Sequence, residues 1–342
     1  MLEQVIQMES VRQVRKRLNK AERCVVVAHV SPDGDAVGSS LALNHFLTDM
    51  GKSARVILPD DFPHYYRWLS GSGDILIHRK QPAEAEQLIY AADIIFCLDL
   101  NEPRRLGALA EAVVTSPGCR IMVDHHLHPA PDFCHLVLSC PTLCSTGEMV
   151  FRLICRMGMY DAITLPMAEC IYTGMMTDTG AFTYNSGYPD IYTIIGELIK
   201  KGIDKDRIYR NVYQVYSEQR LRLMGYLLYE KMRIYPERQT ALMTLTNEEK
   251  VRFSHRTGDT EGFVNLPLGM SGISFSAFLK EEAERIRLSF RSVGDFPSNL
   301  FAARFGGGGH KNAAGGVFEG TMEEAVQVFE EALTVTNPAM FV

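Results

Sequence analysis

The chain has 342 residues, of which 46% are hydrophobic and 22% charged, and its formal net charge is −6 at pH 7. This length suits two domains that each bury a core, and the composition is typical of a soluble globular protein. An acidic protein of this kind does not coat long nucleic acid by counterion release, although a few arginines can still hold one or two phosphates. The first ten residues lack the pattern of a signal peptide, and no apolar run is long enough to span a bilayer. We therefore expect a cytoplasmic protein without membrane association.

Strands and helices alternate through the first part of the chain. Short apolar runs predict buried strands at residues 24–28, 55–59, 94–98 and 120–123. Helices are predicted at residues 37–50, 83–91, 104–114, 145–157 and 165–176, and residues 204–235 are expected to be mostly helical. This alternation indicates a mostly parallel sheet with flanking helices.

The last third of the chain predicts a second, smaller α/β domain. Its strands are expected at residues 239–245, 272–279 and 284–291, and its helices at residues 247–253, 297–304 and 322–334. We predict a catalytic domain at residues 1–215, a helical linker at 216–236 and a substrate-binding domain at 237–342. The active site is expected in the cleft between the two domains.

Aspartates and histidines follow three of the predicted strands, and one more aspartate follows a later helix. These residues are His29, Asp33, Asp35, Asp99, Asp124, His125, His126 and Asp178. Open α/β sheets place their chemistry at the carboxyl ends of the strands. A single aspartate at such a position is usually an ordinary turn or cap residue. So many carboxylates at one edge would repel each other unless cations lay among them, so the pattern predicts a metal cluster.

A run of four glycines, residues 306–309, is followed by His310 and Lys311. Successive glycines can turn several backbone N–H groups toward an anion, and the two basic side chains add charge. The alternative is a tight turn without a ligand. In the strand before it, alternation places Arg291 on the face opposite the core, where an arginine can contact a phosphate or base or simply be solvated.

These motifs resemble those of the DHH phosphoesterase superfamily. The resemblance rests on His29-x3-Asp33-x-Asp35, Asp99, Asp124-His125-His126 and Asp178, and on the glycine run with the sequence to Gly316. The run resembles the signature of the DHH-associated C-terminal domain. Length and domain content are most similar to the nanoRNase/pAp phosphatase group, a family of bifunctional oligoribonucleases.

The resemblance implies two metal sites. His29 and Asp33 would bind one ion, Asp35, His125 and Asp178 would bind the other, and Asp99 would bridge the two. Asp124 would orient the histidines, and His126 would act as a proton donor or only contact the substrate phosphate. Two Mn²⁺ ions suit carboxylate and imidazole ligands, and Co²⁺, Mg²⁺ or Zn²⁺ are also possible. Substrate contacts are expected from Arg291, Gly307, Gly308, Gly309, His310 and Lys311.

The resemblance implies hydrolysis of very short RNAs to mononucleotides and of 3′-phosphoadenosine 5′-phosphate (pAp) to AMP. No long nucleic acid is expected as a substrate, and a homodimer is plausible for this family. The alternative enzyme is a phosphodiesterase for linear or cyclic dinucleotides such as pApA and c-di-AMP. A hypothesis from another class is a catalytically silent nucleotide-binding regulator, which would not require every ligand motif.

Overall fold

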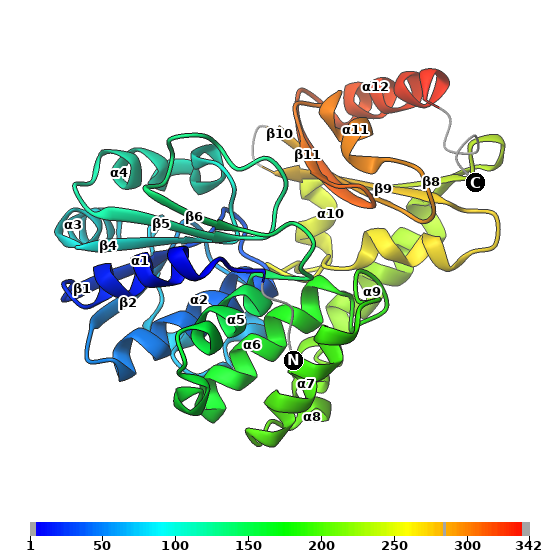
Figure 1. Cartoon of the computed structure of the whole chain (residues 1–342). Helices are drawn as coiled ribbons and strands as arrows, with labels where there is room; N and C mark the ends of the chain where they lie inside the picture. The colour runs from blue at the N-terminus through cyan, green and yellow to red at the C-terminus, as the bar shows by residue number, and fades with distance from the viewer. Residues whose placement is uncertain (1–4, 283–284, 337–342) are drawn as a thin grey trace. The chain divides into compact units, whose positions relative to one another are not determined.

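The computed structural model describes residues 5–282 and 285–336 (Figure 1). The chain forms two compact units, Met1–Val215 and Tyr216–Val342. Residue 284, the first of one predicted strand, and the outermost residues of both predicted domains lie outside the described ranges. Among the described helices, none has the length and apolar character needed to cross a membrane. The role of residues 216–236 as a linker stays a prediction.

The first unit is built on a six-stranded sheet. Its strands are β1 (Arg23–Val27), β2 (Ser53–Leu58), β3 (Leu76–Ile77), β4 (Ile94–Leu98), β5 (Cys119–Asp124) and β6 (Leu136–Ser139). Their order in the sheet is β3-β2-β1-β4-β5-β6, and all neighbours are parallel. The predicted parallel sheet is therefore confirmed. Strand order reverses between β1 and β4, which is the place where open parallel sheets bind ligands.

Helices cover both faces of this sheet (Figure 1). One face packs against α1 (Met8–Leu18), α2 (Gly34–Asp49), α5 (Thr146–Arg156) and α6 (Leu165–Asp178), and the other against α3 (Pro82–Ala91) and α4 (Ala110–Thr115). Alternate residues of β1 point to opposite faces, so Val26 belongs to the first core and Val25 and Val27 to the second. Two further helices, α7 (Pro189–Lys200) and α8 (Lys205–Tyr213), complete the unit. Four 3₁₀ segments connect these elements: His64–Tyr66, Ser72–Asp74, Pro103–Leu109 and Tyr160–Ala162.

Glycines allow α2 and α6 to approach each other closely. A Cβ at Gly38 would lie 2.5 Å from the carbonyl oxygen of Cys170, and one at Gly34 would lie 2.4 Å from Oγ1 of Thr177. Neither distance is possible for a real side chain, so larger residues would push the helices apart. This contact holds the start of α2 against the end of α6.

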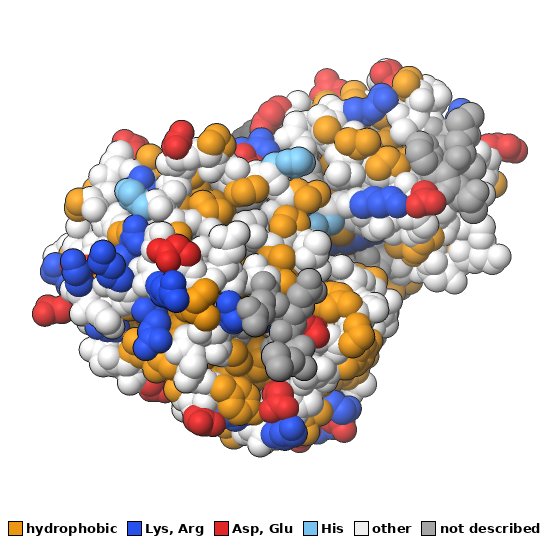
Figure 2. Space-filling view, viewed as in Figure 1, with side chains coloured by type: hydrophobic (Ala, Val, Ile, Leu, Met, Phe, Trp, Pro, Cys, Tyr) orange, Lys and Arg blue, Asp and Glu red, His pale blue; other side chains and the backbone are white. Residues whose placement is uncertain are grey.

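Basic side chains gather on α1 (Figure 2). A shallow hollow there is lined by Arg12, Arg15, Lys16, Asn19 and Lys20. These residues lie on the helix and connection that lead into the amino end of β1. The carboxyl ends of the parallel strands are at the opposite edge of the sheet, so this basic group is remote from that edge.

The second unit has a mixed six-stranded sheet in the order β11-β12-β10-β9-β8-β7. The strands are β7 (Arg233–Tyr235), β8 (Thr240–Leu245), β9 (Phe275–Glu282), β10 (Arg285–Ser292), β11 (Gly308–His310) and β12 (Ala313–Glu319). All neighbouring pairs are antiparallel except β8 and β9. The helices are α9 (Glu218–Tyr226), α10 (Asn247–Arg252), α11 (Ser298–Ala303) and α12 (Met322–Val335), and Leu227–Lys231 forms a π-helical turn. Stacked and edge-on phenylalanines, among them Phe275, Phe290 and Phe329, fill the core.

Two details of the second unit differ from the sequence-based expectation. Residues 233–235 are not helical but form β7, because they pair with β8 at the edge of the sheet. Strand β9 begins at Phe275, three residues later than predicted, because residues 272–274 belong to the turn and bend that lead into it. The predicted smaller α/β domain is otherwise confirmed.

Candidate metal centre

The loop after β1 carries the first group of candidate ligands. Asp33 is the N-cap of α2, and its Oδ1 accepts hydrogen bonds from the backbone N–H groups of Asp35 and Ala36 at 3.1 and 3.0 Å. Its other oxygen, Oδ2, lies 3.8 Å from Nε2 of His29. Nδ1 of His29 lies 2.8 Å from the carbonyl oxygen of Val30. This contact assigns the proton to Nδ1 and leaves Nε2 as a possible metal ligand.

Asp99 follows β4 directly and is almost completely buried, with an exposed fraction of 2%. Its φ of 57° is left-handed, a conformation that aspartate tolerates better than most residues. Oδ2 lies 3.3 Å from Nε2 of His29, and Oδ1 lies 3.5 Å from Nε2 of His125. The two oxygens of one carboxylate thus face two different imidazoles.

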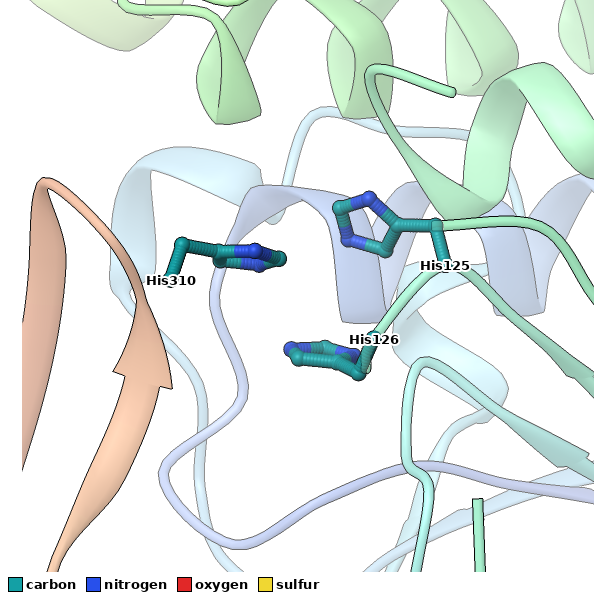
Figure 3. A group of neighbouring side chains, drawn as sticks. All are labelled: His125, His126 and His310. Atoms are coloured by element: carbon teal, nitrogen blue, oxygen red, sulfur yellow. The ribbon is translucent and has the colours of Figure 1, made fainter. Parts of the chain in front are cut away.

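Asp124 ends β5. His125 and His126 follow it, and Figure 3 shows their rings. The fully buried Asp124 accepts hydrogen bonds from the backbone N–H of His126 at 3.0 Å and from its ring Nδ1 at 2.7 Å. Nδ1 of His125 lies 3.2 Å from the carbonyl oxygen of Leu143. Each histidine ring is therefore fixed through Nδ1, and its Nε2 is the atom left for a ligand or substrate.

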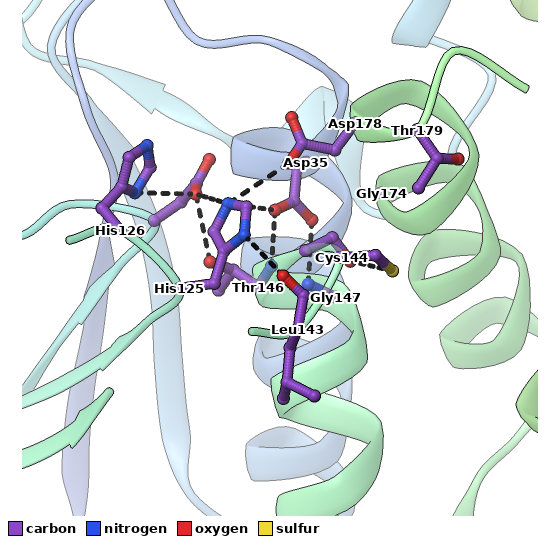
Figure 4. Close-up of polar contacts among 12 residues, drawn as sticks. Asp35, His125, His126, Leu143, Cys144, Thr146, Gly147, Gly174, Asp178 and Thr179 are labelled. Atoms are coloured by element: carbon purple, nitrogen blue, oxygen red, sulfur yellow. Dashed lines mark hydrogen bonds and ion pairs between the residues drawn. The ribbon is translucent and has the colours of Figure 1, made fainter. Parts of the chain in front are cut away.

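Asp178 is the last residue of α6 and completes a second group with Asp35 and His125 (Figure 4). Nε2 of His125 lies 3.2 Å from Oδ2 of Asp178 and 3.9 Å from Oδ2 of Asp35. The structure thus brings together all eight acidic and imidazole residues that the sequence singled out at the sheet edge. Their individual roles stay predictions.

Burial and the neighbouring carboxylates shift the pKa values of several residues in this cluster. Burial and the negative charges of Asp99 and Asp178 raise the pKa of Asp35 well above its usual range. Burial, together with Asp33 and Asp99, raises the pKa of Asp178 to about 7. Burial would lower the pKa of His29, but its hydrogen bonds to Asp33 and Asp99 raise it to about 10. Burial is thus the largest cause of the raised pKa values of Asp35 and Asp178, whereas His29 titrates higher because two carboxylates surround it.

The donor set fits divalent cations. Ligand atoms of His29, Asp33 and Asp99 lie within 4.8 Å of one another, and so do those of Asp35, Asp99 and His125. Asp99 belongs to both groups, and all the donors are carboxylate oxygens or imidazole nitrogens. Hard and intermediate divalent ions prefer such ligands, whereas thiolates would be needed for a soft metal site.

In the second unit, packing accounts for two glycines of the glycine run. A Cβ at Gly307 would lie 1.9 Å from the carbonyl oxygen of Gly315, and one at Gly309 would lie 2.5 Å from that of Ala313. Gly309 also has a φ of 136°, which side chains rarely adopt. A Cβ at Gly308 would meet nothing within 4 Å. Substitution at Gly308 therefore tests ligand binding without a packing cost.

The predicted basic residues of the second unit lie on the same sheet as the glycine run. Arg291 is half-buried on β10, opposite Ala313 of β12, and its Nη1 donates to the carbonyl oxygen of Phe290 at 2.9 Å. His310 ends β11. Lys311 lies in the turn between β11 and β12, where its Nζ forms an exposed ion pair with Oδ1 of Asp295 at 2.6 Å. Substrate binding by these residues stays a prediction.

Sequence reasoning missed Thr146, the first residue of α5. Its hydroxyl donates to Oδ1 of Asp99 at 3.0 Å, and its backbone N–H donates to Oδ2 of Asp35 at 2.6 Å (Figure 4). Ser145 and Glu148, at the start of the helix predicted at residues 145–157, have the spacing of a capping box. Ser145 does cap the helix, but the Glu148 carboxylate accepts from the N–H of Cys144 instead. The available signal was a helix start in the short connection that follows a strand of the same sheet.

Two family models match this chain. The family model described as "DHH family, N-terminal domain" matches residues 23–175, and the DHHA1 domain model matches residues 241–335. A protein of Thermus thermophilus named "Bifunctional oligoribonuclease and PAP phosphatase NrnA" is 30% identical over 95% of both chains. The chain belongs to the DHH family. The predicted resemblance and the predicted class of enzyme, a phosphoesterase, are thereby confirmed.

Two further relatives differ in how much of their length the chain covers. A crystal structure of an exopolyphosphatase-related protein from Bacteroides fragilis has a TM-score of 0.93 and 53% identity, and 99% of both chains is covered. The "Cyclic-di-AMP phosphodiesterase GdpP" of Geobacillus thermodenitrificans is 21% identical over 94% of this chain but only 48% of its own length. The chain thus corresponds to about half of that relative and to nearly all of the other two.

Proposed function

We propose that this protein is a metal-dependent phosphoesterase that hydrolyses very short oligoribonucleotides to mononucleotides and removes the 3′-phosphate of pAp. The proposal rests on the orientation of the Asp99 carboxylate, whose two oxygens face separate groups of carboxylates and imidazoles. The similarity to NrnA along nearly the whole chain supports the substrate class.

In this proposal, His29 and Asp33 hold one cation, Asp35, His125 and Asp178 hold the second, and Asp99 is shared. When bound, two divalent cations activate water as a nucleophile and neutralise negative charge on the phosphoryl oxygens. Mn²⁺ suits this mixture of carboxylate and imidazole, and Co²⁺, Mg²⁺ and Zn²⁺ are alternatives to be compared.

His126 is the proposed contact for the reacting phosphate. Its ring is held by Asp124 through Nδ1, and its side chain keeps an exposed fraction of 15% beside the buried ligands. The ring can thus hydrogen-bond a phosphoryl oxygen or donate a proton to the leaving group. In the second unit, Arg291, His310, Lys311 and the backbone around Gly307, Gly308 and Gly309 are proposed to bind the remainder of the substrate.

The placement of basic side chains supports a short substrate. The basic residues on α1 lie at the amino end of β1, whereas the candidate ligands lie at the carboxyl ends of the strands. A long single strand is usually held by a continuous basic groove that leads to the active site. Reversing the charges of Lys16 and Lys20 to glutamate should therefore leave turnover of a dinucleotide unchanged within about twofold.

A phosphodiesterase for pApA or c-di-AMP is the second candidate, and its support is the similarity to GdpP over most of this chain. A single panel separates the candidates: purified protein with Mn²⁺ and pAp, pApA, c-di-AMP, a labelled 3-mer RNA, a 24-mer RNA or pyrophosphate. We expect release of mononucleotide from pApA and the 3-mer and of phosphate from pAp, with chelation abolishing all three. Turnover of pApA or c-di-AMP without turnover of pAp and the 3-mer would favour the second candidate. Turnover of no nucleotide would favour a silent binding protein. The cytoplasmic location and a homodimer stay predictions.

A further inference from the structure

One short segment touches three of the candidate metal ligands. Residues 143–147, called here the α5 entry segment, lead from β6 into α5. The carbonyl oxygen of Leu143 lies 3.2 Å from Nδ1 of His125. The N–H groups of Thr146 and Gly147 donate to the two oxygens of Asp35 at 2.6 and 2.8 Å. Figure 4 shows these contacts converging from one side of the cluster.

A buried network fixes this segment. Oε2 of Glu148 accepts a hydrogen bond from the N–H of Cys144 at 3.0 Å and another from the hydroxyl of Tyr188. Its Oε1 accepts from Nε of Arg152 at 2.8 Å, and Arg152 also pairs with Asp190 at the start of α7. The side chains of Glu148 and Arg152 are 0% and 3% exposed. Such a satisfied buried network restricts the positions that the start of α5 can take.

Thr146 makes the one side-chain contact from the α5 entry segment to Asp99. Its hydroxyl donates to Oδ1 of Asp99, the oxygen that faces His125, and leaves Oδ2 facing His29. Without this donor, nothing else in the segment would oppose rotation of the carboxylate about its χ2 bond, which is a soft torsion. Thr146 itself is completely buried.

We propose that Thr146 is a positioning residue, which holds the Asp99 carboxylate in the orientation that lets it bridge two cations. This inference rests on the proposed metal pair. Hydrogen bonds to the ligands of a metal typically change its affinity by 10–100-fold. Thr146→Val removes the hydroxyl donor but keeps the side-chain volume and the backbone N–H that holds Asp35. Thr146→Ser keeps the donor.

The matched control is Thr240→Val in the second unit. Thr240 is also completely buried, and its hydroxyl donates to a backbone carbonyl, that of Arg238, at 2.7 Å. Thr240→Val therefore removes a similar buried hydrogen bond, which contributes about 1 kcal/mol to stability, but this bond does not involve a carboxylate. Thr146→Ala is a second variant without the hydroxyl, to be used if the valine variant does not fold.

The test is titration of each metal-free protein with Mn²⁺, followed by electron paramagnetic resonance, which reports free Mn²⁺ and magnetically coupled pairs. We expect two ions per wild-type chain with a coupled signal, and similar results for Thr146→Ser and Thr240→Val. Thr146→Val should bind its weaker ion about 10–100-fold less tightly and lose most of the coupled signal. A purely structural role would lower the urea midpoint without changing the coupling.

Two outcomes would overturn the inference, and they are distinguishable. If Thr146→Val binds two coupled ions with wild-type affinity, Thr146 does not position Asp99 and the proposed function stands. If the wild-type protein itself binds fewer than two ions, the proposed metal pair fails and the positioning role fails with it.

Discussion

Replacing Asp99 by asparagine should separate the metal function of this residue from its contribution to stability. Ligand atoms of Asp35 and Asp99 lie within 4.8 Å of each other, where two negative charges repel by about 3 kcal/mol at an effective dielectric constant of about 20. The substitution relieves this repulsion but removes the attractions of Asp99 to His29 and His125 at 3.3 and 3.5 Å, which come to about 5 kcal/mol each by the same arithmetic because the raised pKa values of both imidazoles keep them charged. Without metal, the Asp99→Asn variant should therefore be less stable than the wild-type protein, so the comparison rests on the additional stability that Mn²⁺ gives to each protein.

Added Mn²⁺ should stabilise the wild-type protein more than the Asp99→Asn variant. At free Mn²⁺ about 1,000-fold above its dissociation constant, one bound ion stabilises the wild-type protein by about 4 kcal/mol. The Asp99→Asn variant should lose most of this gain, and its kcat on pAp should fall by about 1,000-fold or more, which corresponds to about 4 kcal/mol. Urea unfolding with and without Mn²⁺ measures the first effect and phosphate release the second.

Asp93 provides the control from the other end of the same strand. It immediately precedes β4, is exposed, and accepts hydrogen bonds from the N–H groups of Glu22 and Arg23 at 2.8 Å. Asp93→Asn should keep both the Mn²⁺ stabilisation and the turnover of the wild-type protein. The reasoning is refuted if Asp99→Asn is stabilised by Mn²⁺ as strongly as the wild-type protein and retains near-normal turnover.

Four other substitutions give sharp expectations. A Cβ at Gly174 would lie 2.5 Å from Oδ1 of Asp35, so Gly174→Ala should weaken Mn²⁺ binding at least tenfold by titration. A Cβ at Gly196 in α7 would meet open space, so Gly196→Ala should stabilise the fold by about 0.5–1 kcal/mol. Gly308→Ala should raise the KM for pAp at an unchanged urea midpoint, and an unchanged KM would remove this residue from the substrate site. Burial lowers the pKa of His255 from 6.5 to about 4. The unfolded chain then binds more protons between these values, so stability should fall as the pH drops below about 6.5, and His255→Gln should flatten that slope in urea titrations at pH 7 and pH 5.

The sequence predicted the candidate ligands because their placement depends on local features. Apolar strands are short and easily recognised, and a residue such as Asp99 or His125 that directly follows one must lie at the carboxyl edge of a parallel sheet. The position of Asp178 at the end of α6 was also predictable, since the apolar pattern stops there. The parallel sheet and the smaller second domain followed from the alternation of strands and helices.

The surroundings of the ligands were not predictable, because they depend on contacts between distant segments. Thr146 reaches Asp35 and Asp99 across 111 and 47 residues of sequence. The packing role of the glycine run was also not predictable from the sequence. Its composition predicted an anion site, yet the structure gives Gly307 a packing reason that only the approach of β12 reveals.

Fixed dipoles counter part of the negative charge of the cluster before any cation binds. The start of α2 donates two N–H groups to Asp33, and the start of α5 donates two to Asp35. Helix starts carry a partial positive charge, so both carboxylates are stabilised where they lie. His29 and His125 are each held through Nδ1 at a backbone carbonyl. The positions of the candidate ligands therefore come from the fold. Binding of the two proposed cations should require little rearrangement, which is the condition under which a shared carboxylate can set the spacing of two ions.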